Sequence, residues 1–296
     1  MFRFLNLTLD GVANGMIFAA IALALVLIWR ATRIVNFAQG GMLMVTTFIA
    51  WDLWQNHGVS YPLVVVVAVV SGLVFGALIE RIIIRPVHAG PPLNAVIVTL
   101  GLLIFLEGAA GMIWGNSQSH SLRPGFSIVG YRVGENRLFF GPNDTYIVVA
   151  VSVIVVGLYV LFQRTPVGLR MRASAFNPEV ARMLGVRVGG MLTLGWALAA
   201  GVGALAGVLV AGTKPGYVTP DGFDGLLVSG FTAAVIGGLD SPVGAVVGGL
   251  VLGVLLSYGD SYVSGEIEPM YTLVILIAVL MLRPNGLFAR AATRRV

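Results

Sequence analysis

The 296-residue sequence contains no cysteine and only three histidines, His57, His88 and His120, which lie far apart along the chain. The absence of cysteine excludes disulfides, thiolate metal ligands and cysteine nucleophiles within these residues. Three scattered histidines do not supply the spacing of a zinc site. We therefore expect no metal centre, no cofactor and no catalytic residue.

Charge is also scarce. Asp, Glu, Lys and Arg make up 10% of the residues, whereas an average globular protein carries about 25%. Hydrophobic residues make up 57%, and the mean hydropathy is +0.93. Because so few polar side chains cannot cover a water-facing surface, the composition indicates an integral membrane protein. The net charge of +5 comes from basic residues between apolar runs, which indicates membrane topology rather than a nucleic-acid partner.

Runs without charged residues mark the candidate membrane spans, because a charge at mid-membrane costs about 2.5 to 3.5 kcal/mol. The runs cover residues 11–29, 34–51, 53–79, 86–106, 145–163, 188–213, 225–239, 241–258 and 269–282. Backbone amides must be paired inside lipid, so we expect these runs to be helices. The sequence therefore predicts an all-α polytopic membrane protein with eight or nine helical segments.

Five or six of these runs approach the roughly 20 residues that a spanning helix needs. The segments near 41–54, 226–239, 243–257 and 270–282 are shorter, and each is expected either to span or to be broken and partly re-entrant. The first run is longer than a signal-peptide core and has no small-residue cleavage site after it, so we expect it to remain as a helix.

The distribution of charge predicts the orientation of the chain. Most of the 18 basic residues fall on one side of the predicted spans, and most of the 13 acidic residues fall on the other. Short cytoplasmic loops collect positive charge, so the N-terminus is expected outside and the C-terminus in the cytoplasm. Residues 115–144 then form an outer loop and residues 163–188 a cytoplasmic loop. We expect one transmembrane domain over residues 1–296.

The predicted spans form two sets of four, before residue 115 and after residue 187, separated by the span near 145–162. The two sets therefore enter the membrane from opposite sides, and in each set the second segment is short and bordered by turn-forming residues. Such matching short segments point to a transport site near the membrane midplane. The candidate path residues are Asn36, Gln39, Gly40, Thr46, Thr99, Ser229, Thr232, Gly237 and Gly238. The alternative is that the polar groups bond between helices and the glycines pack them.

One carboxylate, Glu107, directly follows the charge-free run 86–106 and is expected within the same membrane helix. Ionisable groups in the membrane mark ion or proton paths by default. A single carboxylate without a basic partner in another span is a poor proton relay, so we favour a structural hydrogen bond for Glu107.

The cytoplasmic loop carries the signals of a short helix over residues 178–184. Asn177 suits the N-cap, Pro178 the first helical position, Glu179 the positive helix end, and Gly185 the C-terminal stop.

Three apolar residues of this helix, Val180, Met183 and Leu184, recur at the spacing of one helix face, with Arg182 on another face. So short a helix cannot bury this apolar stripe by itself. The stripe is expected either to lie on the inner surface of the bundle or to dock into a groove of a cytoplasmic partner.

Several motifs resemble those of the branched-chain amino-acid ABC transporter permeases. The residues that match the coupling region of that family are Gly168, Arg172, Ala173, Asn177, Ala181 and Gly185, and Pro178, Glu179 and Arg182 lie among them. Three further elements at 36–40 (NFAQG), 234–245 (AVIGGLDSPVGA) and 283–288 (RPNGLF) are similar to family motifs and occur in family order. The resemblance covers the chain and is to the shorter of the two permease types, the LivH type.

The resemblance implies a permease subunit that imports branched-chain or other hydrophobic amino acids across the bacterial inner membrane by alternating access. It also implies a second homologous permease subunit as a heterodimer partner, two cytoplasmic ATP-binding subunits and a periplasmic solute-binding protein. The chain has no G-x-x-x-x-G-K-[ST] motif, so we expect ATP hydrolysis on a separate chain.

Some features do not follow the family pattern. The loop 115–144 carries no matching motif, Asp240 stands where a small or polar residue is expected, and nothing marks the substrate. Amides, urea and aromatic acids therefore stay open as cargo. The rival hypotheses are an ion- or proton-coupled secondary transporter and a structural membrane anchor; the first lacks the several membrane carboxylates it normally needs, and the second does not explain the capped basic loop.

Overall fold

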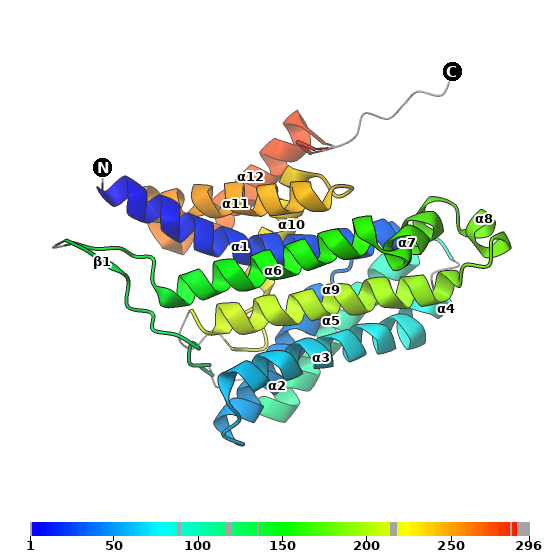
Figure 1. The fold of residues 1–296 in the computed structure, drawn as a ribbon, viewed down its shortest axis with the longest axis horizontal. Coiled ribbons are helices and arrows are strands. Elements are labelled where there is room, and N and C mark those ends of the chain that lie inside the picture. The colour runs from blue at the N-terminus through cyan, green and yellow to red at the C-terminus, as the bar shows by residue number, and fades with distance from the viewer. Residues whose placement is uncertain are drawn as a thin grey trace.

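The computed structural model describes residues 2–87, 90–115, 120–134, 136–213, 218–284 and 286–288. His88 and Asn285, named above, lie outside the described residues. The helices are α1 (Phe2–Thr32), α2 (Gln39–Gln55), α3 (Tyr61–Ile79), α4 (Arg85–Val87), α5 (Pro92–Trp114), α6 (Pro142–Arg164), α7 (Pro166–Phe176), α8 (Pro178–Met183), α9 (Val188–Ala211), α10 (Asp224–Gly237), α11 (Pro242–Gly259) and α12 (Glu268–Leu282). Figure 1 shows the arrangement.

Irregular helical turns join some of these elements. A π-helix, Glu80–Ile84, continues α3 into α4, and a second π-helix, Asp260–Ser264, followed by a 3-10 turn, Gly265–Ile267, connects α11 to α12. The connection before α6 holds two short antiparallel strands, β1 (Arg132–Val133) and β2 (Asn136–Arg137). This hairpin is a small departure from the all-α prediction.

Each charge-free run of the sequence overlaps one or two helices in the described part of the chain, which confirms a mostly helical polytopic membrane protein. In the described part of the chain, six helical stretches are long and apolar enough to cross a membrane, namely Phe2–Thr32, Tyr61–Val87, Pro92–Trp114, Pro142–Arg164, Val188–Ala211 and Pro242–Leu282. Helix α10, with 14 residues, is about 21 Å long and shorter than the roughly 30 Å hydrocarbon core. The number of crossings and the orientation stay predictions.

Helix α1 begins earlier than the sequence pattern indicates, at Phe2 instead of near residue 11. Asp10, which interrupts the apolar run, accepts hydrogen bonds from Ser257 Oγ at 2.9 Å and from Asn14 Nδ2 at 3.2 Å. Because its carboxylate is paired in this way, the helix continues through the charged position.

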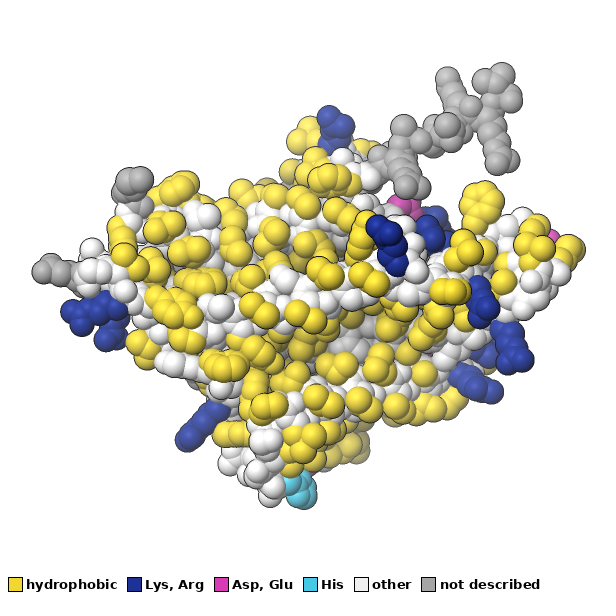
Figure 2. All heavy atoms as spheres, in the orientation of Figure 1, with side chains coloured by type: hydrophobic (Ala, Val, Ile, Leu, Met, Phe, Trp, Pro, Cys, Tyr) yellow, Lys and Arg dark blue, Asp and Glu magenta, His cyan; other side chains and the backbone are white. Residues whose placement is uncertain are grey.

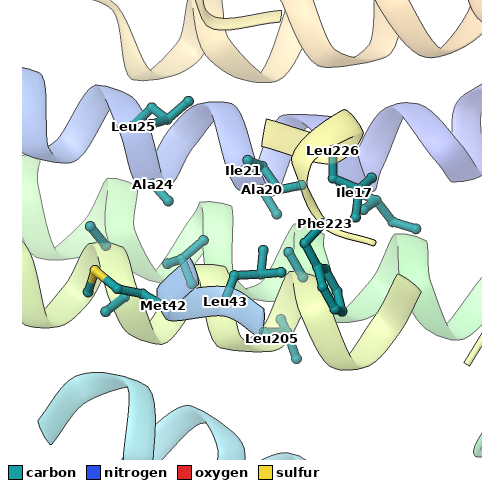
Figure 3. Packing of buried hydrophobic residues seen from close by; sticks show 14 of the residues in the cluster. Ile17, Ala20, Ile21, Ala24, Leu25, Met42, Leu43, Leu205, Phe223 and Leu226 are labelled. Atoms are coloured by element: carbon teal, nitrogen blue, oxygen red, sulfur yellow. The ribbon is translucent and has the colours of Figure 1, made fainter. Parts of the chain in front are cut away.

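Helices α1 and α9 form the centre of the bundle. In each, 89% of the most apolar stretch is buried inside the protein, whereas the corresponding fractions are 28%, 22% and 17% in α3, α5 and α6. Figure 3 shows side chains of α1, α2 and α9 meeting between the ribbons, with Phe223 and Leu226 entering from the start of α10. The outer helices therefore present most of their apolar side chains to lipid.

The two predicted sets of helices pack on each other reciprocally. Helix α1 packs most extensively on α11, and α9 packs most extensively on α3. Helix α1 also contacts α10 as α9 contacts α2, and the pairs α2–α5 and α10–α12 correspond. The first helix of each set thus lies against the second and third helices of the other set.

Glycines permit the closest of these contacts. A Cβ added to Gly15 of α1 would lie 2.9 Å from the carbonyl oxygen of Gly249 in α11. On the opposite pair, a Cβ on Gly72 of α3 would lie 2.7 Å from the carbonyl oxygen of Ala200 in α9. Helix backbones approach this closely in membranes only through small residues, as the glycine content predicts.

The bundle has two distinct ends. We call the end that carries α7, α8 and Arg33 the α8 end, and the end that carries the start of α1 and the β1–β2 hairpin the hairpin end (Figure 1). Figure 2 shows Lys and Arg side chains near the ends of the helices on the face in view, with hydrophobic side chains dominating between them. This pattern is typical of a membrane-embedded bundle.

Candidate functional site

The two short second helices begin inside the bundle and meet there. Gln39, the first residue of α2, donates a hydrogen bond from Nε2 to the carbonyl oxygen of Ala199 at 3.2 Å, and Ala199 lies in the middle of α9. A Cβ on Gly40 would lie 3.4 Å from the Leu227 side chain of α10. We call this meeting point of residues 36–41 and 223–227 the midpoint junction.

The N-F-A-Q-G element shapes the start of α2. Asn36 Oδ1 accepts a hydrogen bond from the Ala38 amide at 3.1 Å, and Asn36 Nδ2 donates to Gln39 Oε1 at 3.3 Å. The side chains of Asn36 and Gln39 are both fully buried. Their local hydrogen bonds satisfy the polar groups of a chain that turns inside the bundle before helix formation resumes.

The hydroxyl candidates for the path are buried along the neighbouring helices. Thr46 donates to the carbonyl of Leu43 at 2.9 Å, Thr99 to that of Val96 at 2.9 Å, and Thr232 to that of Val228 at 2.8 Å. Ser229 is also buried, on α10. In this conformation the threonines are satisfied within their own helices, and their role in a path stays a prediction.

Glu107 meets a second carboxyl group beside the midpoint junction. Its carboxyl group lies next to that of Asp224, the first residue of α10. The Cβ position of Gly41 lies 3.2 Å from Leu106, so α5 carries Glu107 alongside the start of α2. The sequence did not predict this pairing, because Asp224 follows a turn-forming segment and was expected to lie in a loop outside the membrane.

An ion pair with a buried carboxylate at the α8 end was also missed. Glu80 is 1% exposed and accepts two hydrogen bonds from Arg85, at 3.1 and 2.9 Å, and one from Thr193 Oγ1 at 2.7 Å. Arg85 also donates to the carbonyl of Gly189 at 2.8 Å. We call Glu80, Arg85 and Thr193 the α3–α9 clamp. It joins the end of α3 to the first turns of α9.

The π-helix explains why Glu80 and Arg85 meet. Residues four apart lie on one face of an α-helix, whereas the wider π turn over Glu80–Ile84 brings residues five apart together. Opposite charges five residues apart therefore do not predict an ion pair from sequence alone. They predict one only where a π turn is known.

Gly237 and Gly238 form the turn between α10 and α11. Gly238 has φ +93°, a left-handed conformation that favours glycine at a helix end. The backbone of Gly237 contacts that of Gly244, and the Ser241 hydroxyl caps α11 by accepting from the Gly244 amide at 2.9 Å. These glycines serve close backbone packing at the α8 end, away from the midpoint junction.

The closing R-P-x-G-L-F motif docks on this turn. The Leu287 amide donates to the carbonyl of Ile236 at 2.8 Å, and the Phe288 amide to that of Gly237 at 3.3 Å. Two motifs that are distant in sequence therefore pack together, because the amides of residues 287 and 288 donate to the last carbonyls of α10.

Asp240, which departs from the family pattern, forms a salt bridge with Arg33. The side chains are 61% and 58% exposed for Arg33 and Asp240 respectively. Arg33 follows α1 and adopts φ +59°. Asp240 therefore joins the end of α1 to the α10–α11 turn by a solvent-exposed ion pair.

The basic loop at the α8 end contains two helices, of which the sequence signals predicted only the second. Helix α7 is capped by Thr165 Oγ1, which accepts from the Gly168 amide at 3.2 Å, with Pro166 in its first turn. Helix α8 is capped as predicted. Asn177 Oδ1 accepts from the amides of Glu179 and Val180, both at 3.1 Å.

The remaining coupling candidates hold α7 against the end of α6 and form its junction with α8. Gly168 packs against the backbone of Phe162. Arg172 donates to the carbonyl of Gly168 and to Gln163 Oε1, each at 3.4 Å, and the carbonyl of Ala173 accepts from the Asn177 amide. The left-handed residue that ends α8 is Gly185, with φ +79°.

The apolar stripe of α8 faces away from the bundle. Val180, Met183 and Leu184 are 48%, 84% and 76% exposed, whereas Ala181 is 2% exposed. The polar side chains of Glu179 and Arg182 are exposed beside the stripe. The bundle therefore does not cover these apolar side chains.

Known proteins resemble this chain in sequence and fold. It is 28% identical to the high-affinity branched-chain amino acid transport system permease protein BraD of Pseudomonas aeruginosa, covering 100% of this chain and 99% of that one. It is 30% identical to the probable branched-chain amino acid transport permease protein LivH of Methanocaldococcus jannaschii, covering 90% and 87%. In fold it is similar to a chain of PsaBC from Streptococcus pneumoniae in complex with Fab, with TM-score 0.50 and 14% identity, over 96% and 94% of the two chains.

A family model described as the permease component of the branched-chain amino acid transport system matches residues 7–283. This match spans both sets of helices, the midpoint junction, α7 and α8. The chain therefore belongs to the family of branched-chain amino acid transport system permease components.

Proposed function

We propose that this chain is the membrane-spanning subunit of an ATP-driven importer for branched-chain or other hydrophobic amino acids. The observation that carries the proposal is the uncovered apolar stripe of α8, because it distinguishes the two expectations for the basic loop. A helix that rested on its own bundle would bury Met183 and Leu184, yet they are 84% and 76% exposed. A groove on a cytoplasmic ATP-binding subunit would cover them.

A direct mechanical connection leads from α8 into the bundle. Helix α8 is followed after four residues by α9, whose first turns are held to α3 by the α3–α9 clamp. We infer that movement of α8 during ATP binding displaces α9 and α3 together, and that the two inverted halves rock around the midpoint junction. The reciprocal packing of α1 on α11 and of α9 on α3 supports this division into halves.

The proposed path runs beside the starts of α2 and α10. Broken or short helices that meet at mid-bundle are where transporters place their substrates. We assign Gln39, Gly40 and the neighbouring hydroxyl residues to this path. In the present conformation these side chains are buried, so the path opens only when the halves move.

The proposal also includes partners and location. They are a second homologous permease subunit in a heterodimer, two cytoplasmic ATP-binding subunits and a periplasmic solute-binding protein, in the bacterial inner membrane. The names of the relatives, which describe permease proteins of transport systems, support a multi-component assembly. In this assembly the α8 end faces the cytoplasm.

One observation favours the rival function of an ion- or proton-coupled carrier. The neighbouring carboxyl groups of Glu107 and Asp224 lie at the midpoint junction, and carboxylates at such a place mark ion paths by default. A coupled carrier would require Glu107, whereas an importer driven by ATP would not require its charge.

Reconstitution of the chain in proteoliposomes separates these functions. With its ATP-binding and solute-binding partners, we expect uptake of labelled leucine that needs ATP and persists in the Glu107→Gln variant. Competition by unlabelled isoleucine, amides, urea and phenylalanine then identifies the cargo class. Uptake by the chain alone, driven by an ion gradient and lost in Glu107→Gln, would overturn the importer.

Orientation is tested with single cysteines, since the chain has none of its own. Arg182 on α8 and Tyr262, which is 63% exposed near the hairpin end, are accessible positions. We expect an impermeant thiol reagent to label Arg182→Cys only from the cytoplasmic side and Tyr262→Cys only from the outside. Labelling of both from one side would contradict the proposed topology.

A further inference from the structure

An apolar groove lies on the surface of the bundle between α1, α6 and the start of α11. Its volume is about 210 Å³, and its walls include Leu23 of α1, Val155, Val156 and Tyr159 of α6, and Val243 of α11. Val156, Tyr159 and Val243 are more than half exposed. Because α6 is the least buried of the six long apolar stretches of the described chain, the groove opens sideways, toward lipid.

The groove ends in basic and polar side chains at the α8 end. Arg30 and Gln163 line it there, next to Phe162. On the other side of Phe162, a smaller hollow is lined by Arg30 and by Arg172 of α7. Arg172 also donates to Gln163 Oε1, so Arg30 and Arg172 are both residues of the same end of the groove.

The charged residues among the described lining of the groove and the hollow are arginines. No Asp or Glu is among the described residues that line the groove or the hollow, and the nearby Asp240 is occupied by Arg33. An apolar groove that opens to lipid and ends at two arginines complements a molecule with acyl chains and an anionic head group. Basic pockets between membrane helices recognise anionic phospholipids in this way.

We propose that this groove binds one anionic phospholipid, with the phosphate at Arg30 and Arg172 and an acyl chain along Val156, Tyr159 and Val243. The site is distinct from the midpoint junction and from the apolar stripe of α8. Because Arg172 belongs to α7, which leads directly into α8, the bound lipid holds this loop against α1 and α6.

The test is native mass spectrometry of the full-length chain, alone and in its assembled transporter, with phosphatidylglycerol or phosphatidylcholine of equal chain length. We expect one phosphatidylglycerol to be retained about fivefold more tightly than phosphatidylcholine for each arginine that contacts the phosphate. The Arg30→Gln variant should lose about fivefold of this preference and keep the share that Arg172 supplies. The matched control Arg164→Gln removes the same charge from an exposed residue of α6 outside the groove and should keep the full preference.

A second pair of variants tests the groove without changing charge. Val156→Trp fills the groove and should weaken binding of both lipids, whereas Val153→Trp, on an exposed residue of α6 outside the groove lining, should not. An equal loss in Arg164→Gln and Arg30→Gln would assign the preference to diffuse charge and overturn the site. Equal retention of the two lipids, displacement by glycerol phosphate, or loss of the lipid in the assembled transporter would each overturn it too.

Discussion

The centre of the bundle buries its apolar side chains, whereas the loop of α7 and α8 leaves several of them exposed. In the centre, glycines bring α1 and α11 into backbone contact, and buried polar groups such as Gln39 have partners. In the loop, α8 is well capped, yet Met183 and Leu184 stay uncovered. The difference is that the centre of the bundle covers its own apolar and polar groups, whereas α8 leaves an apolar stripe that the proposed ATP-binding subunit would cover. Substitutions in the two regions should therefore affect different measurements.

The largest effect on stability is expected from Gly249→Leu in α11. A side chain there would strike the backbone of Ala19 in α1, and overpacking of this kind costs about 3 kcal/mol or more. Thermal unfolding in detergent micelles, followed by size-exclusion chromatography, measures it. The control Gly108→Leu places the same side chain on α5 where nothing lies within 4 Å, and its melting temperature should match the wild type. Equal melting of the two variants would refute the close contact.

A smaller loss is expected from Glu80→Ala in the α3–α9 clamp. Removing one partner of a buried pair typically costs 3 to 5 kcal/mol, and we expect about 2 kcal/mol here because Arg85 can reach water. Arg85 is 39% exposed and Glu80 is 2% exposed in their side chains. The double variant with Arg85→Ala should lose less than the sum of the two single variants. Additive losses in unfolding experiments would show that the two residues act independently.

The exposed pair of Arg33 and Asp240 should contribute less. The side chains of Arg33 and Asp240 are 61% and 58% exposed. Asp240→Asn is therefore expected to lower the free energy of unfolding by at most about 1 kcal/mol. This loss should shrink at high salt, because salt screens the pair. Melting temperatures of wild type and variant at low and high salt provide the measurement. A loss as large as that of Glu80→Ala, or one that salt does not change, would be inconsistent with an exposed ion pair.

The smallest effect on stability is expected from the double variant Met183→Ala and Leu184→Ala. Their side chains are mostly exposed, and such surface substitutions usually change stability by about 0.5 kcal/mol or less. The control on the same helix is Ala181→Leu, which enlarges a residue that is 2% exposed and should lower the melting temperature. A clear drop in melting temperature for the double variant would show that the bundle covers the stripe after all.

The sequence predicts the membrane helices and α8 because these follow from local information. Charge-free runs locate the helices, and Asn177 with Gly185 locates the ends of α8. Helix α7 was not predicted, since its alternating arginines and small residues form no apolar stripe. Its cap, Thr165, is recognisable only after the helix is seen.

The contacts of the candidate site depend on tertiary structure and could not be predicted. The Glu80 and Arg85 pair needs a π turn, the Asp240 and Arg33 pair joins distant parts of the chain, and Glu107 meets Asp224 only because α10 begins inside the bundle. Helix periodicity carries no information on such pairings. The short second segments point to a transport site near the membrane midplane, which stays a prediction, whereas the hydrogen bonds of Gln39 depend on how α2 packs against α9.

The most direct test of the account is the amount of ATP-binding subunit retained by each folded permease molecule. The permease is co-expressed with its partners and carries Met183→Ala and Leu184→Ala, alone or with Glu179→Ala and Arg182→Ala. Removal of side chains that a groove buries costs at least about tenfold in affinity when they dominate the contact. The account predicts such a loss of ATP-binding subunit at an unchanged melting temperature. Wild-type retention and transport in the quadruple variant would contradict it.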